Sequence, residues 1–100
     1  LNAEDYYQEY EVVTASDGLK GLYAYRRYHL LPPIYKQIVL NNYHARVQNR
    51  EGKWAVYALN QECFKTDFIF DRIWYDTGRA AIIGDTDAGE HILARMHFRY

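Results

Sequence analysis

Residues 43–59 read YHARVQNREGKWAVYAL, and this stretch decides the fold class. In residues 43–48 apolar and polar side chains alternate, so that Tyr43, Ala45 and Val47 share one face of an extended chain. After a turn at residues 50–52, residues 54–59 are apolar on both faces. A period of two is typical of strands, because successive side chains of a strand point to opposite faces. The stretch therefore predicts two strands joined by a turn.

Turn signals recur along the rest of the chain at short intervals, which suits strands better than helices. Asp17-Gly18 is a hairpin signal, and Pro32-Pro33 is expected to end the element that precedes it. Alternation continues through residues 64–71 and 91–100, while residues 2–10 can form one short helix capped by Asn2. We expect a single mainly β domain over residues 1–100, with no internal repeat. About five to seven strands would form a small bent sheet or a closed barrel, since closure removes exposed edges.

Composition places the chain among ordinary globular domains, with one unusual feature. Its 100 residues are 49% hydrophobic and 25% charged, but 17% are aromatic and eleven are Tyr. Tyrosine suits both pleated sheets and binding surfaces. The single cysteine, Cys63, cannot form an internal disulfide, and no apolar run is long enough to span a bilayer. These observations predict a soluble, cytoplasmic protein that does not bind membranes.

Charge is segregated along the chain, although the formal net charge is only −1. No acidic residue lies between Asp17 and Glu51, and six basic residues with five interleaved tyrosines occupy that interval. Cations attract phosphate and tyrosine rings can stack on bases, so the pattern favours a nucleic-acid surface. An alternative is that these bases simply neutralise the acidic first seventeen residues on a neighbouring strand. The candidate ligand-binding residues are Arg26, Arg27, Lys36, Arg46, Arg72, Tyr25, Tyr43 and Tyr57.

Other chemistry has little support in the sequence. His91 and His97 are not at a zinc spacing, and nearby arginines would oppose a cation. Cys63 has no evident base beside it, and residues 85–90 lack the ligands of a calcium loop. There is no glycine-rich phosphate loop and no nucleophile elbow. We therefore expect no metal, no cofactor and no enzymatic activity.

Residues 52–59, GKWAVYAL, followed by residues 63–73, CFKTDFIFDRI, resemble the core of the WYL domain family. The resemblance covers about a quarter of the chain. It implies a small SH3-like β barrel of the kind found in bacterial transcriptional regulators, with a basic and aromatic face that binds nucleic acids or nucleotides. Trp54 and Tyr57 would lie on the first motif strand, and Arg72 would occupy the second arginine position of the family. Ile69 replaces the first arginine, which removes one expected ligand contact.

Two functional hypotheses remain open at this point. The first is a non-enzymatic regulatory module that binds single-stranded nucleic acid, a nucleotide or another phosphorylated ligand. The second is a protein–protein module: a homodimer, a subunit, or a small inhibitor of phage or bacterial origin. Tyrosine and arginine are enriched at the centres of protein interfaces, so the composition of the chain is also consistent with this second hypothesis.

Overall fold

The computed structural model describes residues 9–24, 28–41 and 43–95. Across these residues the chain forms strands and turns, with no helix. The strands are β1 (Tyr10–Thr14), β2 (Lys20–Ala24), β3 (Tyr28–Tyr35), β4 (Gln37–Asn41), β5 (His44–Gln48), β6 (Trp54–Ala58), β7 (Cys63–Phe64), β8 (Arg72–Asp76), β9 (Ala81–Thr86) and β10 (Gly89–Arg95).

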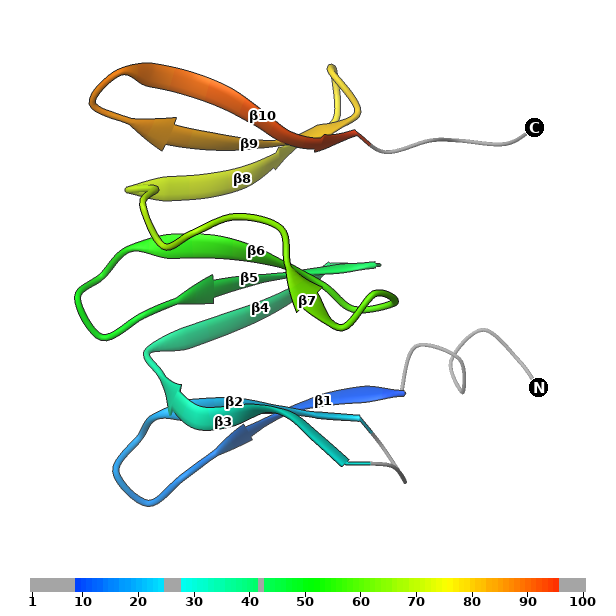
Figure 1. The fold of residues 1–100 in the computed structure, drawn as a ribbon, viewed down its shortest axis with the longest axis vertical. Helices are drawn as coiled ribbons and strands as arrows, with labels where there is room; N and C mark the ends of the chain where they lie inside the picture. Colours follow the sequence, from blue (N-terminus) through cyan, green and yellow to red (C-terminus); the bar gives the residue numbers. More distant parts are fainter. Residues whose placement is uncertain (1–8, 25–27, 42, 96–100) are drawn as a thin grey trace.

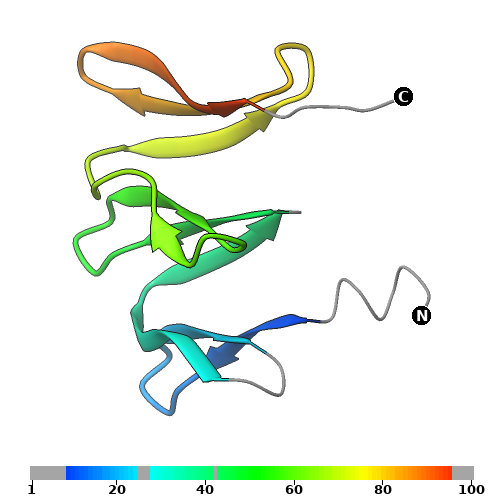
Figure 2. The ribbon, with the colours of Figure 1, turned by 45° about the vertical axis from the view of Figure 1, so that its right-hand side comes forward.

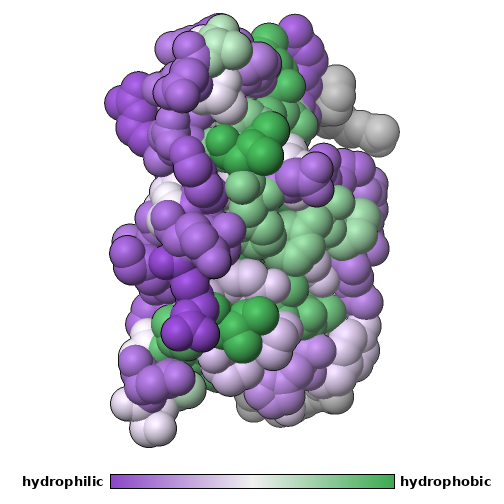
Figure 3. Space-filling view, turned by 60° about the vertical axis from the view of Figure 1, so that its left-hand side comes forward, coloured by the Kyte–Doolittle hydropathy of each residue, from purple (hydrophilic) through white to green (hydrophobic). Residues whose placement is uncertain are grey.

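The strands form three separate antiparallel sheets and not one barrel (Figure 1). The first sheet is β1-β2-β3, the middle sheet is β4-β5-β6-β7, and the third sheet is β8-β9-β10. Figure 2 shows the same three levels after rotation of the molecule, and Figure 3 shows a band of hydrophobic surface (green) bordered by hydrophilic surface (purple) on one face. The prediction of a mainly β domain is confirmed. The predicted closure and the count of five to seven strands are not what the described residues form, because ten strands are divided among three open sheets that pack through their hydrophobic faces.

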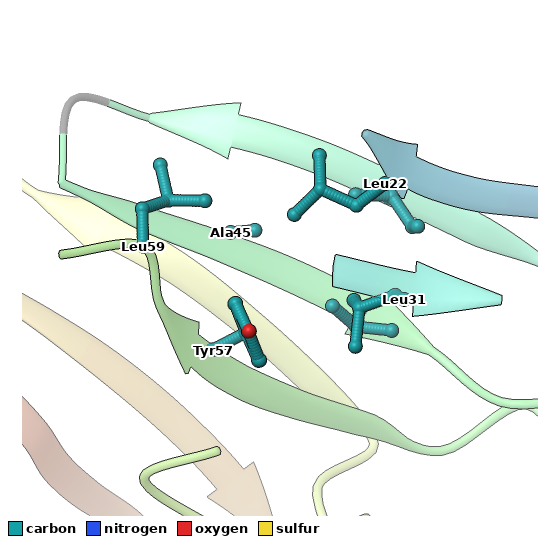
Figure 4. Close-up of a cluster of buried hydrophobic side chains, with 7 residues drawn as sticks. Leu22, Leu31, Ala45, Tyr57 and Leu59 are labelled. Carbon is teal, nitrogen blue, oxygen red and sulfur yellow. The ribbon is translucent and has the colours of Figure 1, made fainter. Parts of the chain in front are cut away.

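Two hydrophobic cores join the sheets. The first core lies between the first and middle sheets and consists of Leu22, Leu31, Ile38, Ala45, Val47, Tyr57 and Leu59 (Figure 4). The second core lies between the middle and third sheets and consists of Val56, Phe70, Ile73 and Ile82. The middle sheet thus contributes opposite faces to the two cores. This arrangement explains why β6 is apolar on both faces, as its sequence predicts.

The chain contains a structural repeat that its sequence does not reveal to simple inspection. Tyr10 pairs with Ala24 and Thr14 with Lys20 in the first hairpin. Adding 34 to each number gives the pairs of the second hairpin, His44 with Ala58 and Gln48 with Trp54. Adding 37 to the second hairpin gives the third, in which Ala81 pairs with Arg95. A bulge between Ile92 and Ala94 shifts the third register by one residue near its turn.

The connections between hairpins repeat as well. Lys20 pairs with Tyr35 after the first hairpin, and Trp54 bridges Phe70 after the second, at offsets of 34 and 35. A glycine with positive φ lies in or directly after each hairpin turn, at Gly18, Gly52 and Gly89. The expectation of no internal repeat was therefore wrong. Backbone pairing is conserved between the units, whereas few side chains are identical.

The prolines do not end the preceding element, contrary to expectation. Strand β3 continues from Tyr28 to Tyr35 through Pro32 and Pro33. Both prolines lie where the pairing of β2 with β3 is interrupted, between Leu31 and Tyr35, so no ladder hydrogen bond is lost. The strand predicted over residues 64–71 is broken, since only β7 and the bridge at Phe70 pair there. The predicted helix over residues 2–10 lies largely outside the described residues, and β1 begins at Tyr10.

Candidate binding groove

A groove of about 300 Å³ lies between the middle sheet and the first strand of the third sheet. It is lined by Arg46, Trp54, Arg72, Ile73 and Trp74. Arg46 comes from β5, Trp54 begins β6, and the other three begin β8. The two tryptophans of the chain therefore lie at one site together with two arginines.

Backbone pairing sets the position of Arg46. It is paired with Val39 on one side and Val56 on the other, so its side chain lies on the face of the middle sheet that meets the third sheet. Its Nη1 donates a hydrogen bond of 3.0 Å to the carbonyl oxygen of Ile73. The Nε atom is buried and has no hydrogen-bond partner. Burial of an unpaired donor destabilises a protein, so this arginine is not explained by packing alone.

The repeat makes the departure at Arg46 visible. The equivalent positions in the other two hairpins are Val12 and Ile83, at offsets of 34 and 37. Val12 packs against the first core, and Ile83 is fully buried. The fold therefore accommodates an aliphatic side chain at this position, and only the middle hairpin replaces it with a cation.

Arg72 presents its guanidinium at the mouth of the groove. Its side chain is 72% exposed, and Nη2 donates to Oδ2 of Asp85 at 2.6 Å. The guanidinium carbon lies 5.4 Å from the ring centroid of Trp74, within range of a cation–π contact. The hydrogen bond to Asp85 raises the pKa of Arg72, so the residue stays cationic.

Trp54 is held by main-chain bonds to the segment that leads into β8. Its N–H donates to the carbonyl of Phe70 at 2.8 Å, and the Phe70 N–H donates back at 3.3 Å. Beside this bridge, the ammonium of Lys53 pairs with the carboxylate of Asp71, and that hydrogen bond raises the pKa of Lys53. The bridge fixes one wall of the groove, because it ties the middle sheet to the start of the third.

The structure gathers two of the predicted site residues, Arg46 and Arg72, into the groove. Lys36 and Tyr43 are both exposed but lie at opposite ends of β4, away from it. Tyr57 belongs to the first core and is only 3% exposed, and burial raises the pKa of its hydroxyl. Its ring consequently has no free surface for stacking, which corrects its proposed role. The predicted residues Tyr25, Arg26 and Arg27 lie outside the described residues.

Sequence reasoning missed Trp74 as a site residue and named Trp54 only through the family resemblance. Neither residue lies in the acid-free interval that drew attention to the basic segment. An alignment of the repeat units could, however, have indicated both residues. Once the units are aligned, Trp54 and Trp74 occupy the positions of Lys20 and Val39, so the large indoles appear only at the second sheet junction.

The groove offers cations and aromatic rings but no catalytic set. In the described part of the chain no three metal-ligating side chains converge. Cys63 is exposed and lies outside the groove lining. None of the five lining residues is a carboxylate, histidine or cysteine that could act as a general base or a nucleophile. Its chemistry is that of holding an anion beside a flat ring.

Comparison of the chain with protein-family models, curated proteins and solved structures finds no match. The resemblance of residues 52–73 to the WYL domain family accordingly stays a prediction. In residues 9–24, 28–41 and 43–95 no helix is long and apolar enough to cross a membrane.

Proposed function

We propose that this protein is a non-enzymatic binding module that holds one nucleotide unit of a single-stranded nucleic acid in the groove. Arg46 and Arg72 would contact a phosphate, while Trp54 and Trp74 would stack on the base. The observation that carries the proposal is Arg46, a half-buried cation whose Nε atom is buried without a hydrogen-bond partner, at a position where the other hairpins place the aliphatic residues Val12 and Ile83.

The size and chemistry of the groove support a small ligand. About 300 Å³ is at the lower end of the range for small-molecule sites and matches a single nucleotide better than a larger cofactor. Tryptophan supplies a stacking surface that tolerates any base. Two guanidinium groups give strong, directional hydrogen bonds to phosphate oxygens. Recognition would therefore depend on hydrogen bonds to the phosphate and on stacking of the base against tryptophan, more than on which base is present.

Asp85 would set the affinity of the free groove. It already accepts a hydrogen bond from Arg72, so an incoming phosphate must compete with this carboxylate. Asp85→Asn removes the competing charge and is expected to tighten binding. The same substitution would weaken binding if Asp85 instead oriented Arg72 for the ligand.

Intrinsic fluorescence provides the test, because the only two tryptophans of the chain line the groove. We expect a thymidine oligonucleotide to quench the emission in a saturable manner. Raising the salt from about 50 to 200 mM should weaken binding about 7- to 12-fold if two phosphate contacts are made at about 0.7 to 0.9 counterions each. Free adenosine monophosphate, titrated in parallel, shows whether the strand or only one nucleotide is needed.

Two matched variants show whether the fluorescence quenching comes from binding in the groove. Arg46→Leu removes the groove cation, and a loss of affinity of about 10-fold or more is expected for a charged hydrogen bond. Arg50→Leu makes the same chemical change at an exposed turn outside the groove and should leave the affinity unchanged. Saturable quenching that is equal in both variants, or no quenching at low salt, contradicts the proposed site.

A further inference from the structure

One position of the repeat carries a hydrogen-bond acceptor in each of the three hairpins. Gln48 is the last residue of β5, and the equivalent residues of the first and third hairpins are Thr14 and Asp85, at offsets of 34 and 37. Each of these residues has a cross-strand neighbour on the second strand of its hairpin. In the middle and third sheets it has another neighbour on the preceding strand, β4 or β8. The hydrogen-bond donors that reach the three acceptors can therefore be compared directly.

In the first and third sheets a cation on a neighbouring strand donates to this acceptor. The Nζ atom of Lys20 donates to Oγ1 of Thr14 at 2.9 Å, and the two residues are cross-strand partners. The Nη2 atom of Arg72 donates to Oδ2 of Asp85 at 2.6 Å, and these two residues are also cross-strand partners. In both sheets the repeat thus places a donor directly beside the acceptor.

The middle sheet departs from this pattern at Gln48. Its cross-strand neighbours are Gln37 on β4 and Trp54 on β6, which replace the arginine and the lysine of the other two sheets. The Nε2 atom of Gln48 donates to the carbonyl oxygen of Gly52 at 3.2 Å, but the Oε1 atom is buried and has no hydrogen-bond partner. Burial of an acceptor without a donor is unfavourable, so the protein alone leaves one hydrogen bond unmade at this point.

The unpaired acceptor belongs to a row of polar side chains that passes through the groove. His44, Arg46 and Gln48 share one face of β5, because side chains alternate along a strand. Within the described residues, the buried side-chain atoms that lack a hydrogen-bond partner are Nδ1 of His44, Nε of Arg46 and Oε1 of Gln48. All three therefore lie in this row. Such a concentration beside a groove is the arrangement expected where a bound molecule supplies the missing partners.

The order of residues around Gln48 matches the order of groups in a nucleotide. Gln48 is the direct cross-strand neighbour of Trp54, and the Cβ atoms of such a pair lie about 4.5 to 5.5 Å apart. It is two residues from Arg46 on the same strand, which corresponds to about 6.4 to 6.8 Å. In a nucleotide the sugar joins the phosphate to the base. A ligand with its phosphate at Arg46 and its base on Trp54 therefore has its sugar beside Gln48.

We propose that the groove selects RNA over DNA because Oε1 of Gln48 accepts a hydrogen bond from the ribose 2′-hydroxyl, an inference that rests on the function proposed above. A carbonyl oxygen can only accept, so its partner must be a donor. Inside a strand the 3′ and 5′ oxygens are esterified, and the 2′-hydroxyl is the donor that ribose offers and deoxyribose lacks. Gln48 is thus a specificity-determining residue that reads the sugar and not the base.

The test compares three strands that differ only at the 2′ position, namely oligouridine, oligodeoxyuridine and 2′-O-methyl oligouridine. Quenching of the tryptophan fluorescence at about 50 mM salt measures the three affinities. We expect oligouridine to bind about 3- to 10-fold more tightly than the other two strands, which corresponds to one neutral hydrogen bond. The methylated strand keeps the 2′ oxygen but has no hydrogen to donate, so it separates loss of the donor from loss of the ribose conformation.

A pair of matched variants tests the role of Gln48. Gln48→Met removes the acceptor with little change in size, and the affinity for oligouridine should fall to that for oligodeoxyuridine. An unchanged affinity for oligodeoxyuridine shows that the groove of this variant is intact. Gln61→Met makes the same chemical change at an exposed residue in the turn after β6, and the preference for oligouridine should remain.

The outcomes separate this inference from the function on which it rests. Equal affinities of the wild type for oligouridine and oligodeoxyuridine, or a preference for oligouridine that survives in Gln48→Met, overturn the role of Gln48 but leave a nucleic-acid groove in place. Absence of binding to all three strands overturns the proposed function, and the preference for RNA with it.

Discussion

The two sheet junctions of this protein share a backbone plan but serve different purposes. The first junction buries seven residues in a continuous core, among them Leu22 and Tyr57. The second buries four and leaves room for a groove with two arginines and two tryptophans. At the equivalent point of the two junctions Val12 packs against the core, whereas Arg46 lines the groove. The comparison teaches that the same backbone arrangement can produce either a continuous hydrophobic core or a groove. A few side chains determine which of the two is formed.

Truncation of equivalent isoleucines should give the largest contrast between the junctions. Ile38 and Ile73 occupy matching positions, since they pair with β5 and β9, the equivalent strands of two hairpins, and they are 7% and 6% exposed. Each change to alanine is expected to destabilise the fold by about 2 to 5 kcal/mol, and Ile38→Ala should lie higher in that range because more buried neighbours surround it. Urea unfolding followed by circular dichroism measures both values. A larger cost for Ile73→Ala would mean that the second core, and not the first, holds the stack together.

Adding a methyl group to buried glycines should have the next largest effect. A Cβ at Gly21 would lie 2.8 Å from the Leu31 carbonyl oxygen and 2.9 Å from the Pro33 nitrogen, which are backbone atoms. A Cβ at Gly84 would meet only side chains, those of Phe70 and Leu93. Gly84→Ala is therefore expected to cost about 1 to 3 kcal/mol, and Gly21→Ala more than that. Melting temperatures of the two variants decide the order, and equal values would show that β3 can move away from β2.

Replacement of Arg46 by an aliphatic residue, as at the equivalent position of the first junction, should change the free energy of unfolding very little. Arg46→Leu restores an aliphatic side chain at the position of Val12 and removes a buried Nε with no partner. It also deletes the hydrogen bond to Ile73, worth about 0.5 to 1.5 kcal/mol. We expect the free energy of unfolding to stay within about 1 kcal/mol of the wild type while ligand affinity falls. A loss of several kcal/mol would instead make Arg46 a structural residue.

Replacement of His44 should have the smallest effect, which we expect only in the pH dependence of the free energy of unfolding. Desolvation, with a smaller contribution from Lys65, lowers the pKa of His44 from its ordinary value of 6.5. Below that value the unfolded chain binds a proton that the folded chain resists, so stability should fall as the pH drops from about 6.5 toward the folded pKa. His44→Gln should flatten this part of the profile. Urea midpoints between pH 7.5 and pH 5 measure it, and identical slopes would show that His44 is not responsible.

The fold class could be predicted from the sequence because its signal is local. Alternation in residues 43–48 and the apolar run in residues 54–59 specify strands by themselves, and glycines mark the hairpin turns. The stacking could not be predicted in this way. The units recur at offsets of 34 to 37 residues with different side chains, so no fixed period appears in the sequence.

The groove was predictable only in part. Arg46 and Arg72 were selected for their charge, but 26 positions separate them, and only the stacking of the third sheet on the middle sheet brings them together. Tyr57 was selected for its ring, yet its strand is buried on both faces because two sheets cover it. The sequence around Trp74 does not by itself indicate a binding residue. Trp74 stands out only when the repeat units are aligned, because the equivalent residue of the preceding unit is Val39. Composition can propose residue types, but the assignment of faces requires tertiary structure.

The order of the strands has a consequence for the speed of folding. Each of the seven ladders formed by residues 9–24, 28–41 and 43–95 joins strands that are consecutive along the chain, so none of these ladders requires a partner strand from a distant part of the sequence. Such short-range pairing keeps the contact order low for a β protein, and chains of this kind fold faster than sandwiches or barrels of equal length. Each sheet can form as soon as its own residues are synthesised, and the next sheet then condenses on it.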